Sequence, residues 1–486
     1  MYTFEFLAII LYISILLLIS YASYQKHLSS NDFIIGSRSL NSLLTALSAH
    51  ASDMSSWLFL AYPALVFSQG MLSLWTAIGL IFCMFLNWQL IAPRIRVKTE
   101  QFESLTLSSF FEHRLQDSSG VLRLFSALIL IVFYTIYISA FLIGLGDLLV
   151  SLFPLHYSVA ILLGISIVIP YVFSGGFVTL AWIDLFQGVF LLLVILFIPS
   201  YLMTKISFQE IMPSLTLYHR SPSLFPDFSP STLISILSLS LGWGLGYFGQ
   251  PHIITKFMGI KEVKKISQAK WIGMGWMTLS LGGATLIGLL GISFFQGSLA
   301  NPETLFIQIV KGSFPSFFVG LILCAVLGAT MNAMSSQILV LSSTLSEDFY
   351  KRFINPLASS QKLLRVSRMG VILSCSIAYF IAYHKFSSIY ILVNYAWSGI
   401  GASFGPLLLL SLYAKQLHKY GAWAGILGGG LFSGIWPFLN PHITSYTIAP
   451  LLPAFFFSLI LIIFVSFLCK KSSPPQNLSH KDLLDS

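Results

Sequence analysis

Apolar blocks of roughly twenty residues, separated by short polar segments, make up most of this chain of 486 residues. A helix of that length spans the ~30 Å hydrocarbon core of a bilayer, and lipid leaves it to satisfy its own backbone hydrogen bonds. We therefore expect an all-α polytopic membrane protein with about 13 transmembrane helices. The blocks fall near residues 4–23, 40–69, 71–92, 121–150, 156–173, 183–203, 231–257, 271–297, 316–345, 367–384, 388–413, 419–440 and 448–468.

The composition excludes several classes of protein. Only 9% of the residues are charged and 56% are hydrophobic, whereas a soluble domain is about 25% charged. A soluble enzyme, a nucleic-acid binder and a disordered protein are therefore excluded for the chain as a whole. We expect the lipid bilayer and a small-molecule substrate as partners, with no nucleic acid and no obligate protein partner. The four cysteines have no metal-ligand spacing, so we expect neither a disulfide nor a metal site from them.

Lysine and arginine residues accumulate in alternate loops. If the N-terminus lies outside, the segments predicted to be cytoplasmic hold 22 of the 26 Lys and Arg residues. The positive-inside rule then predicts a multi-pass cell-membrane protein with its N-terminus outside and its C-terminus in the cytoplasm. The same bias supports thirteen helices, because one missed helix would reverse every later loop. The first block is expected to be a retained span, since no signal-peptide cleavage pattern follows it.

Two blocks contain segments that a continuous helix tolerates poorly. The block at 40–69 carries SAHASDMSSW, and the block at 231–257 carries LGWGLGYFGQPH. Glycine costs about 1 kcal/mol and proline about 3 kcal/mol in a helix interior. Unwound backbone at membrane depth survives only where protein buries it or where it lines a cavity. Two broken helices at corresponding positions of two repeats indicate the substrate site of a secondary transporter, so we expect a five-plus-five inverted repeat with two discontinuous helices.

The expected domain division follows from these positions. It comprises a first transmembrane helix with a cytoplasmic loop (1–39), a first inverted repeat (40–203), a second inverted repeat (204–413), two peripheral helices (414–469) and a cytoplasmic tail (470–486).

Asp53 is the one acidic residue well inside a block, and it lies beside the first interruption. A charged side chain at the bilayer centre costs about 2.5–3.5 kcal/mol on insertion scales and usually serves a solute or ion pathway. The structural alternative is that Asp53 or Ser52 caps the half-helix after the break. The two roles are compatible.

Polar and aromatic residues beside the two interruptions are candidates for contact with a small solute. They are Ser55, Ser56, Trp57, Trp243, Tyr247, Gln250 and Pro251. Ordinary packing of small residues and interfacial aromatics is the alternative explanation. His50 and His252 also lie beside the breaks, but a lone buried histidine is usually neutral and hydrogen-bonded, so neither is assigned a proton-relay role.

Several longer strings resemble a known family. The chain reads TALSAHASDMSSWLFLAYP, LGWGLGYFGQPHI, FSGGFVTLAWIDLFQ and NYAWSGIGASFGP. With these strings it resembles the sodium/solute symporter family, and within that family the sodium/proline symporters. The resemblance implies alternating access and symport of L-proline with a sodium ion into the cell.

The resemblance also implies roles for individual residues. Sodium would be held at Ala51, Asp53, Met54, Ala329 and Asn332, the first break supplying backbone carbonyls. Proline recognition would involve Ser55, Trp57, Tyr137, Trp243, Tyr247 and Pro251, although the sequence around Tyr137 alone is typical of plain core. Arg38 and Asp184 match functionally important residues of the family.

Two positions depart from the family pattern. The ninth span usually carries a pair of hydroxyl residues where this chain has Asn332 and Ala333, and Ala333 offers no side-chain oxygen to a cation that prefers several. A small residue usually stands where this chain has His50, a titratable group three residues from Asp53. Proton-coupled symport of proline therefore stays open, as does cation-coupled symport of another small amino acid or an organic acid.

An enzyme and a channel are the competing classes of function. The chain carries no HExxH motif, no paired intramembrane aspartates and no G-x-S-x-G elbow, so we expect no enzymatic activity. A channel usually needs symmetric rings of pore-lining residues, which this sequence does not suggest.

Overall fold

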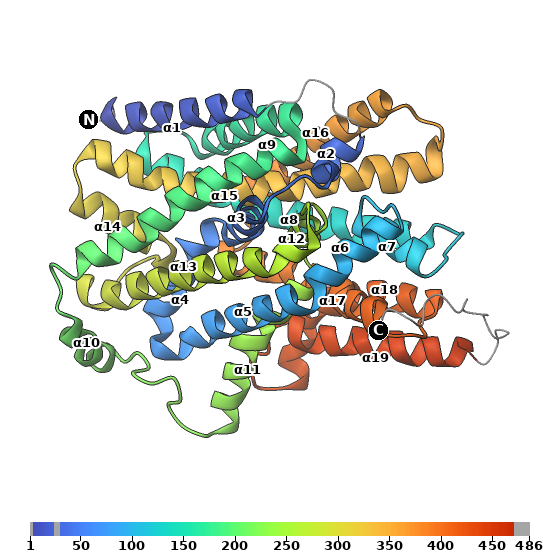
Figure 1. The fold of residues 1–486 in the computed structure, drawn as a ribbon. Coiled ribbons are helices and arrows are strands. Elements are labelled where there is room, and N and C mark those ends of the chain that lie inside the picture. Colours follow the sequence, from blue (N-terminus) through green and yellow to red (C-terminus); the bar gives the residue numbers. More distant parts are fainter. Residues whose placement is uncertain (1–2, 24–29, 471–486) are drawn as a thin grey trace.

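Nearly all of the described chain, residues 3–23 and 30–470 of this computed structural model, is helical, and these residues form no strand (Figure 1). The predicted tail lies almost wholly outside them, at 471–486. The helices are α1 (Thr3–Ala22), α2 (Ser30–Ile35), α3 (Ser42–Met54), α4 (Ala61–Gln69), α5 (Leu74–Leu86), α6 (Ala92–Gln101), α7 (Leu107–Arg114), α8 (Val121–Leu152), α9 (Tyr157–Leu202), α10 (Ile211–Leu217), α11 (Pro230–Gly244), α12 (Pro251–Met258), α13 (Ile266–Phe294), α14 (Leu305–Ser313), α15 (Ser316–Ser343), α16 (Ser360–His384), α17 (Ile389–Tyr413), α18 (Lys419–Ile443) and α19 (Leu451–Lys470).

Short segments of tighter or wider helix join several of these elements. The 3₁₀ segments are η1 (Gly36–Arg38), η2 (Ser56–Leu58), η3 (Met71–Ser73), η5 (Phe208–Glu210), η6 (Leu245–Gly249), η7 (Val263–Lys265) and η8 (Pro302–Thr304). Two π-helical segments, η4 (Asn87–Ile91) and η9 (Thr344–Ile354), follow α5 and α15. Sequence patterns did not predict these π segments, which often occur at functional positions in helices.

The expected number of membrane crossings is confirmed in the described part of the chain. Eleven helices there are long and apolar enough to cross a bilayer. The broken pair α3 and α4 supplies another crossing, and the shorter apolar stretch Tyr157–Ile169 at the start of α9 supplies the thirteenth. The predicted bounds differ in places: the third crossing continues as far as Gln101, and residues 174–182, expected to be a loop, are helical apart from a sharp break at Gly176.

The two broken crossings run in opposite directions. Isolated backbone bridges join the chain just before α3 to the chain after α12 (Leu40 with Ile260) and the residue after α4 to the chain before α11 (Gly70 with Ser221). The first broken crossing therefore begins at the end of the bundle where the second finishes. This antiparallel pairing is what a five-plus-five inverted repeat requires of the first helix of each repeat.

The positively charged loops gather at one end of the bundle, which we call the basic end. Arg38 donates to the backbone carbonyls of Met258 (2.8 Å) and Ser104 (3.2 Å). Arg352 donates to the Glu112 carboxylate at 2.8 Å. These bonds bring the segments 93–123, 256–270 and 351–368 together, as the predicted alternation of loops requires.

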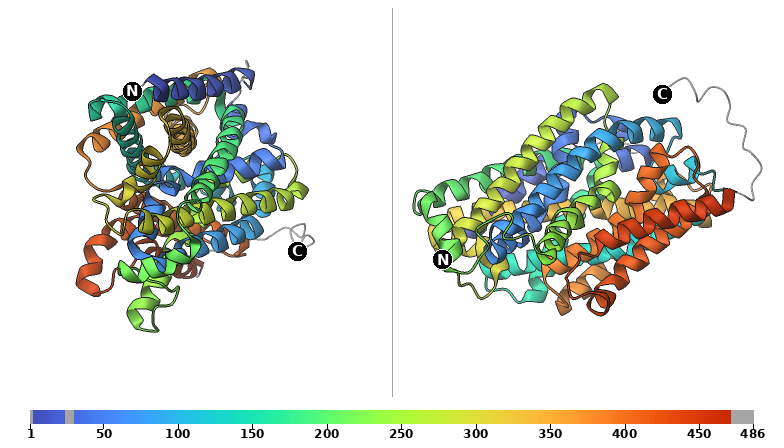
Figure 2. Two further views of the ribbon diagram at one scale, coloured as in Figure 1. Left: turned by 90° about the vertical axis from the view of Figure 1, so that its left-hand side faces the viewer. Right: turned by 90° about the horizontal axis from the view of Figure 1, so that it is seen from below.

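The broken crossings lie in the middle of the bundle, and the last two helices lie at its edge. Labels α3 and α12 stand near the centre of Figure 1, and α18 and α19 pack together along the side opposite α1 (Figures 1 and 2). Helix α1 packs against α9 and α15. Lipid-facing helices therefore surround a centre where irregular backbone is shielded, as membrane depth demands.

The contact between α5 and α11 gives a test of this packing. A Cβ atom added at Gly79 of α5 would lie 2.2 Å from the backbone oxygen of Ser240 in α11. We predict that Gly79→Ala lowers the thermal unfolding midpoint of the detergent-purified protein, because overpacking against backbone costs about 1–3 kcal/mol.

The matched control is Gly275→Ala in α13, where nothing lies within 4 Å of the added atom. Its midpoint should stay unchanged or rise, since alanine favours a helix interior by about 1 kcal/mol over glycine. Equal midpoints for the two variants would contradict the close crossing of α5 and α11.

Candidate functional site

The first break leaves the end of α3 with unpaired backbone oxygens. Helix α3 ends at Met54, and Ser55 takes φ 41° and ψ −165°. The last four carbonyls of a helix, here those of residues 51–54, have no partner within the helix. They form the negative end of the helix dipole, which favours a cation.

Ser55 starts the short helix that follows the break. Its hydroxyl oxygen accepts a hydrogen bond from the backbone N–H of Trp57 at 3.2 Å. The expectation that Asp53 or Ser52 caps the following half-helix is therefore wrong: both residues belong to the last turn of α3. The carboxylate of Asp53 is left available for contacts with other helices.

The second break lies between α11 and α12. The chain continues from Gly244 as the 3₁₀ segment η6, becomes extended at Gln250, and re-enters an α-helix at Pro251. Gly246 makes this path possible, because a Cβ atom there would lie 2.0 Å from the indole nitrogen of Trp397. The glycines and the proline that predicted the interruption thus occur where the backbone changes its form.

A buried hydrogen bond joins the two breaks. The Tyr247 hydroxyl of η6 donates to the carboxylate of Asp53 at the end of α3, and both side chains are buried. The backbone carbonyl of Tyr247 accepts from the side-chain amide of Asn87 at 3.0 Å. Asn87 belongs to the π segment η4, so an irregular turn in a third crossing holds the second break in place.

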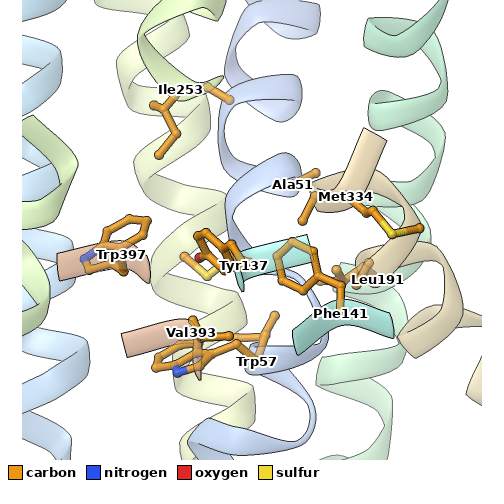
Figure 3. Close-up of a cluster of buried hydrophobic side chains, with 14 of the residues drawn as sticks. Ala51, Trp57, Tyr137, Phe141, Leu191, Ile253, Met334, Val393 and Trp397 are labelled. Carbon is orange, nitrogen blue, oxygen red and sulfur yellow. The ribbon is translucent and has the colours of Figure 1, made fainter. Parts of the chain in front are cut away.

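A cavity of about 270 Å³ lies beside this bond. Six predicted site residues line it, and Leu80, Val393 and Trp397 complete the wall. The six are Asp53, Met54, Trp57, Tyr137, Trp243 and Tyr247. Figure 3 shows Trp57, Tyr137, Val393 and Trp397 gathered around this centre. The wall is mostly aromatic with one carboxylate, and pockets for small molecules are typically lined by apolar and aromatic side chains with a few polar groups.

Tryptophan side chains fix the cavity wall. The Trp397 indole donates to the backbone carbonyl of Trp243 at 2.8 Å. The rings of Trp57 and Trp243 lie 5.1 Å apart, centroid to centroid. Trp397 is a cavity residue that sequence reasoning did not identify. It lies in the string NYAWSGIGASFGP, but it is not beside a break and its spacing is that of an ordinary core residue.

Four predicted solute contacts and His50 lie outside the cavity lining. Ser55 and Ser56 are buried next to it, Gln250 donates to the Trp397 carbonyl at 3.2 Å, and Pro251 lines a second cavity. The His50 imidazole accepts from the indole of Trp88 in η4 at 3.0 Å and stacks on that ring, and the ring of Trp276 in α13 lies 6.2 Å away. His50 therefore faces away from the cavity that Asp53 lines.

The predicted cation ligands belong to α3 and α15, two helices that pack against one another. Ala51, Met54, Ala329 and Asn332 are all buried, and Figure 3 shows Ala51 next to Met334 of α15. Both polar atoms of the Asn332 side chain lack a hydrogen-bond partner. A buried amide oxygen without a donor is a suitable ligand for a hard cation. No three His, Cys, Asp or Glu side chains cluster within the described residues.

Arg38 and Asp184 occupy the basic half of the molecule. Burial, with Arg96 nearby, lowers the pKa of Arg38 to about 10, so the guanidinium stays charged at neutral pH while it bonds the end of α12. The buried Asp184 carboxylate of α9 accepts from the Ser48 hydroxyl of α3 and from the ammonium of Lys256 in α12 at 3.0 Å. One side chain from each broken crossing therefore donates to the same carboxylate, that of Asp184.

Lys256 is a buried charged residue of this cluster that the sequence did not predict to be buried. It was counted with the basic loop after the seventh block, but it lies inside α12 with 2% of its side chain exposed. The signal that pointed to it was Asp184, since a carboxylate buried in a membrane protein requires a partner.

Comparisons with known proteins agree over most of the chain. The sequence profile of the sodium:solute symporter family matches residues 33–429. The high-affinity proline transporter PutP of Bacillus subtilis is 38% identical over 464 residues, which cover 94% of this chain and 97% of that protein. A sodium/proline symporter of Haemophilus influenzae is 37% identical over 482 residues, covering 96% and 95%. A solved sodium-coupled sialic acid symporter shares the fold, with a TM-score of 0.82 at 17% identity over 98% of this chain and 99% of that chain.

The bond between Tyr247 and Asp53 generates a test of cation binding. A ligand that binds only the folded protein raises its unfolding midpoint by an amount that grows with the logarithm of 1 + [L]/Kd, so sodium chloride should raise the midpoint relative to choline chloride. Tyr247→Phe removes a hydrogen bond to a charged group, worth about 1.5–3 kcal/mol. The sodium concentration needed for a given shift of the midpoint should then rise roughly tenfold or more.

Tyr395→Phe is the matched control, because its hydroxyl donates to the Gly434 carbonyl instead of a cavity residue. Its sodium dependence should equal that of the wild type. If Tyr247→Phe also kept the wild-type sodium dependence, the Tyr247–Asp53 bond would not contribute to cation binding.

Proposed function

Because the chain belongs to the sodium:solute symporter family, we propose that it carries L-proline into the cell together with a sodium ion. It is a multi-pass membrane protein of a family of transporters. The observation that carries the proposal is the Tyr247–Asp53 bond, which places two broken helices around one aromatic cavity. The relatives named as proline transporters support the choice of solute.

The chemistry of the cavity suits a small cyclic amino acid. The pyrrolidine ring would pack against Trp57, Tyr137 and Trp243, which supply apolar surface. Its secondary ammonium would lie toward the Asp53 carboxylate and over the tryptophan faces, where a cation gains from the ring quadrupole. Ser55, Ser56, Gln250 and Pro251 would shape the break around the solute.

A sodium ion would be held at the end of α3. The backbone carbonyls of Ala51 and Met54, the carbonyl of Ala329 and the free amide oxygen of Asn332 would supply oxygen ligands. The charge of Asp53 would favour the ion from nearby. Entry of one positive charge through a potential of 100 mV yields about 2.3 kcal/mol to drive uptake.

We place the basic end in the cytoplasm and the N-terminus outside. The supporting observation is the clustering of positively charged loops at one end, which the positive-inside rule assigns to the cytoplasm. The repeats would then comprise residues 40–203 and 204–413, with 414–469 peripheral. Arg38 and the Ser48–Asp184–Lys256 cluster would close the cytoplasmic side while the solute enters from outside.

Proton coupling is the second candidate, and one observation favours it. Ala333 adds no side-chain oxygen and Asn332 adds one, so the oxygen set for sodium is small. A proton relay through His50 has less support, because His50 bonds Trp88 and faces away from Asp53.

Flux with independent ion gradients tests the proposal. In proteoliposomes at a fixed membrane potential, an inward sodium gradient should drive accumulation of labelled proline, and an inward proton gradient without sodium should not. Liposomes lacking the protein give the background. Accumulation driven by the proton gradient and indifferent to sodium would assign the coupling to protons, and no saturable proline flux would reject the solute.

Hydroxyl groups added at the ninth span test the sodium ligands. Asn332→Ser combined with Ala333→Thr supplies two hydroxyl oxygens, and we expect the sodium concentration for half-maximal uptake to fall roughly tenfold, equivalent to about 1.4 kcal/mol. Val319→Thr, which adds a hydroxyl near the start of the same helix, should leave that concentration unchanged. An unchanged value in the double variant would remove Asn332 from the ion site.

A further inference from the structure

A second cavity lies further along α12, toward the basic end. Its lining residues surround about 450 Å³ of space, part of which is open to solvent, and none of them lines the central cavity. Helix α12 contributes Pro251, His252, Thr255 and Lys256 to its wall, and α15 contributes Ser336 among others. Because α12 starts at the second break and ends at the carbonyl bound by Arg38, this cavity lies between the break and the basic end.

One ring nitrogen of His252 has a partner and the other has none. The Tyr134 oxygen accepts from the backbone N–H of His252 at 3.3 Å, and it also lies 3.2 Å from the ring nitrogen Nδ1. The other ring nitrogen, Nε2, is buried and has no partner. When Tyr134 donates to Nδ1, the proton of a neutral ring lies on Nε2.

Two further donors face the same cavity. The Ser336 hydroxyl is buried without a partner. The Lys256 ammonium has three N–H groups, of which one bonds Asp184, and it lies 5.0 Å from the centre of the Phe177 ring. His252 and Lys256 are four residues apart on α12 and therefore share one face of that helix.

Other polar groups in the wall offer oxygens instead of protons. The Thr255 hydroxyl donates to the Pro251 carbonyl and the Ser343 hydroxyl donates to the Leu339 carbonyl. Their lone pairs are left to accept from a ligand. The wall thus combines free donors, free acceptors and the apolar side chains of Leu130 and Leu339.

We propose that this cavity is a second binding site for the transported amino acid on its way to the cytoplasm. In this site Tyr134 donates to Nδ1 of His252, and the solute carboxylate binds Lys256, Ser336 and the Nε2–H of His252. The solute ammonium group binds the oxygens of Thr255 and Ser343. Buried polar atoms without partners are unfavourable, and a carboxylate gives His252 Nε2 and the Ser336 hydroxyl their missing partner. The inference rests on the proposed function, because it takes the ligand to be the transported amino acid.

The site also gives the Asp184–Lys256 pair a role in release. The pair is electrically neutral while closed, and Lys256 keeps two N–H groups for an arriving carboxylate. A solute that engages these groups weakens the hold of Asp184 on Lys256, and with it the link between α9 and α12. Arrival of the solute would thereby favour opening toward the basic end.

Exchange of proline measured separately from each face tests this site. In oriented proteoliposomes with saturating sodium on both sides, the variant Ser336→Ala combined with His252→Leu should raise the proline concentration for half-maximal exchange about tenfold at the cytoplasmic face. The value at the external face should change less than twofold. Ser342→Ala, on the same helix but outside the cavity lining, should leave both values unchanged.

The single variant Ser336→Ala should fold normally, because that hydroxyl makes no hydrogen bond in the folded protein. It keeps the test informative if the double variant misfolds. It should raise the cytoplasmic value severalfold. Replacement of chloride by methanesulfonate should change nothing, whereas a chloride-dependent value would mean that the donors hold a free anion and would overturn the proposal. Equal changes at both faces would also overturn it, with the proposed function intact. No exchange by the wild-type protein would reject the proposed function and this inference together.

Discussion

A single buried hydrogen bond, from the Tyr247 hydroxyl to the Asp53 carboxylate, connects the two places where this helical bundle is interrupted. Each break alone would leave backbone groups or a charge without partners at membrane depth, at a cost of several kcal/mol per group. When the two breaks lie together, Tyr247 of η6 donates a hydrogen bond to the Asp53 carboxylate. Asn87 of a third crossing donates to the backbone carbonyl of Tyr247. The irregular backbone then lines a cavity instead of facing lipid.

The two broken crossings run antiparallel, so they contact one another on both sides of the central cavity. At the basic end, Leu40 pairs with Ile260, and Asp184 gathers Ser48 and Lys256 from both crossings. At the other end, Gly70 pairs with Ser221. A solute in the central cavity can reach one side only if the contacts at that end open while those at the other hold, which is the requirement of alternating access.

Much of this arrangement was predictable because its causes are local. Glycine and proline inside apolar blocks indicated both breaks, and the isolation of Asp53 in an apolar block indicated its place. Other features have long-range causes: Lys256 is buried because Asp184 neutralises it, and His50 lies against Trp88 because Gly273 leaves room for its ring. The helical stretch across 174–182 and the π segments likewise depend on packing that no short window of sequence records.

A double-mutant cycle on Asp53→Asn and Tyr247→Phe, read out as the sodium concentration for half-maximal proline uptake, tests the central claim most directly. If one bond joins the breaks, each single change removes the same interaction, and the combined effect falls short of the sum by at least ~1.5 kcal/mol. Effects that add within about 0.5 kcal/mol would show that the two residues act independently, and the account of two breaks joined through one bond would be wrong.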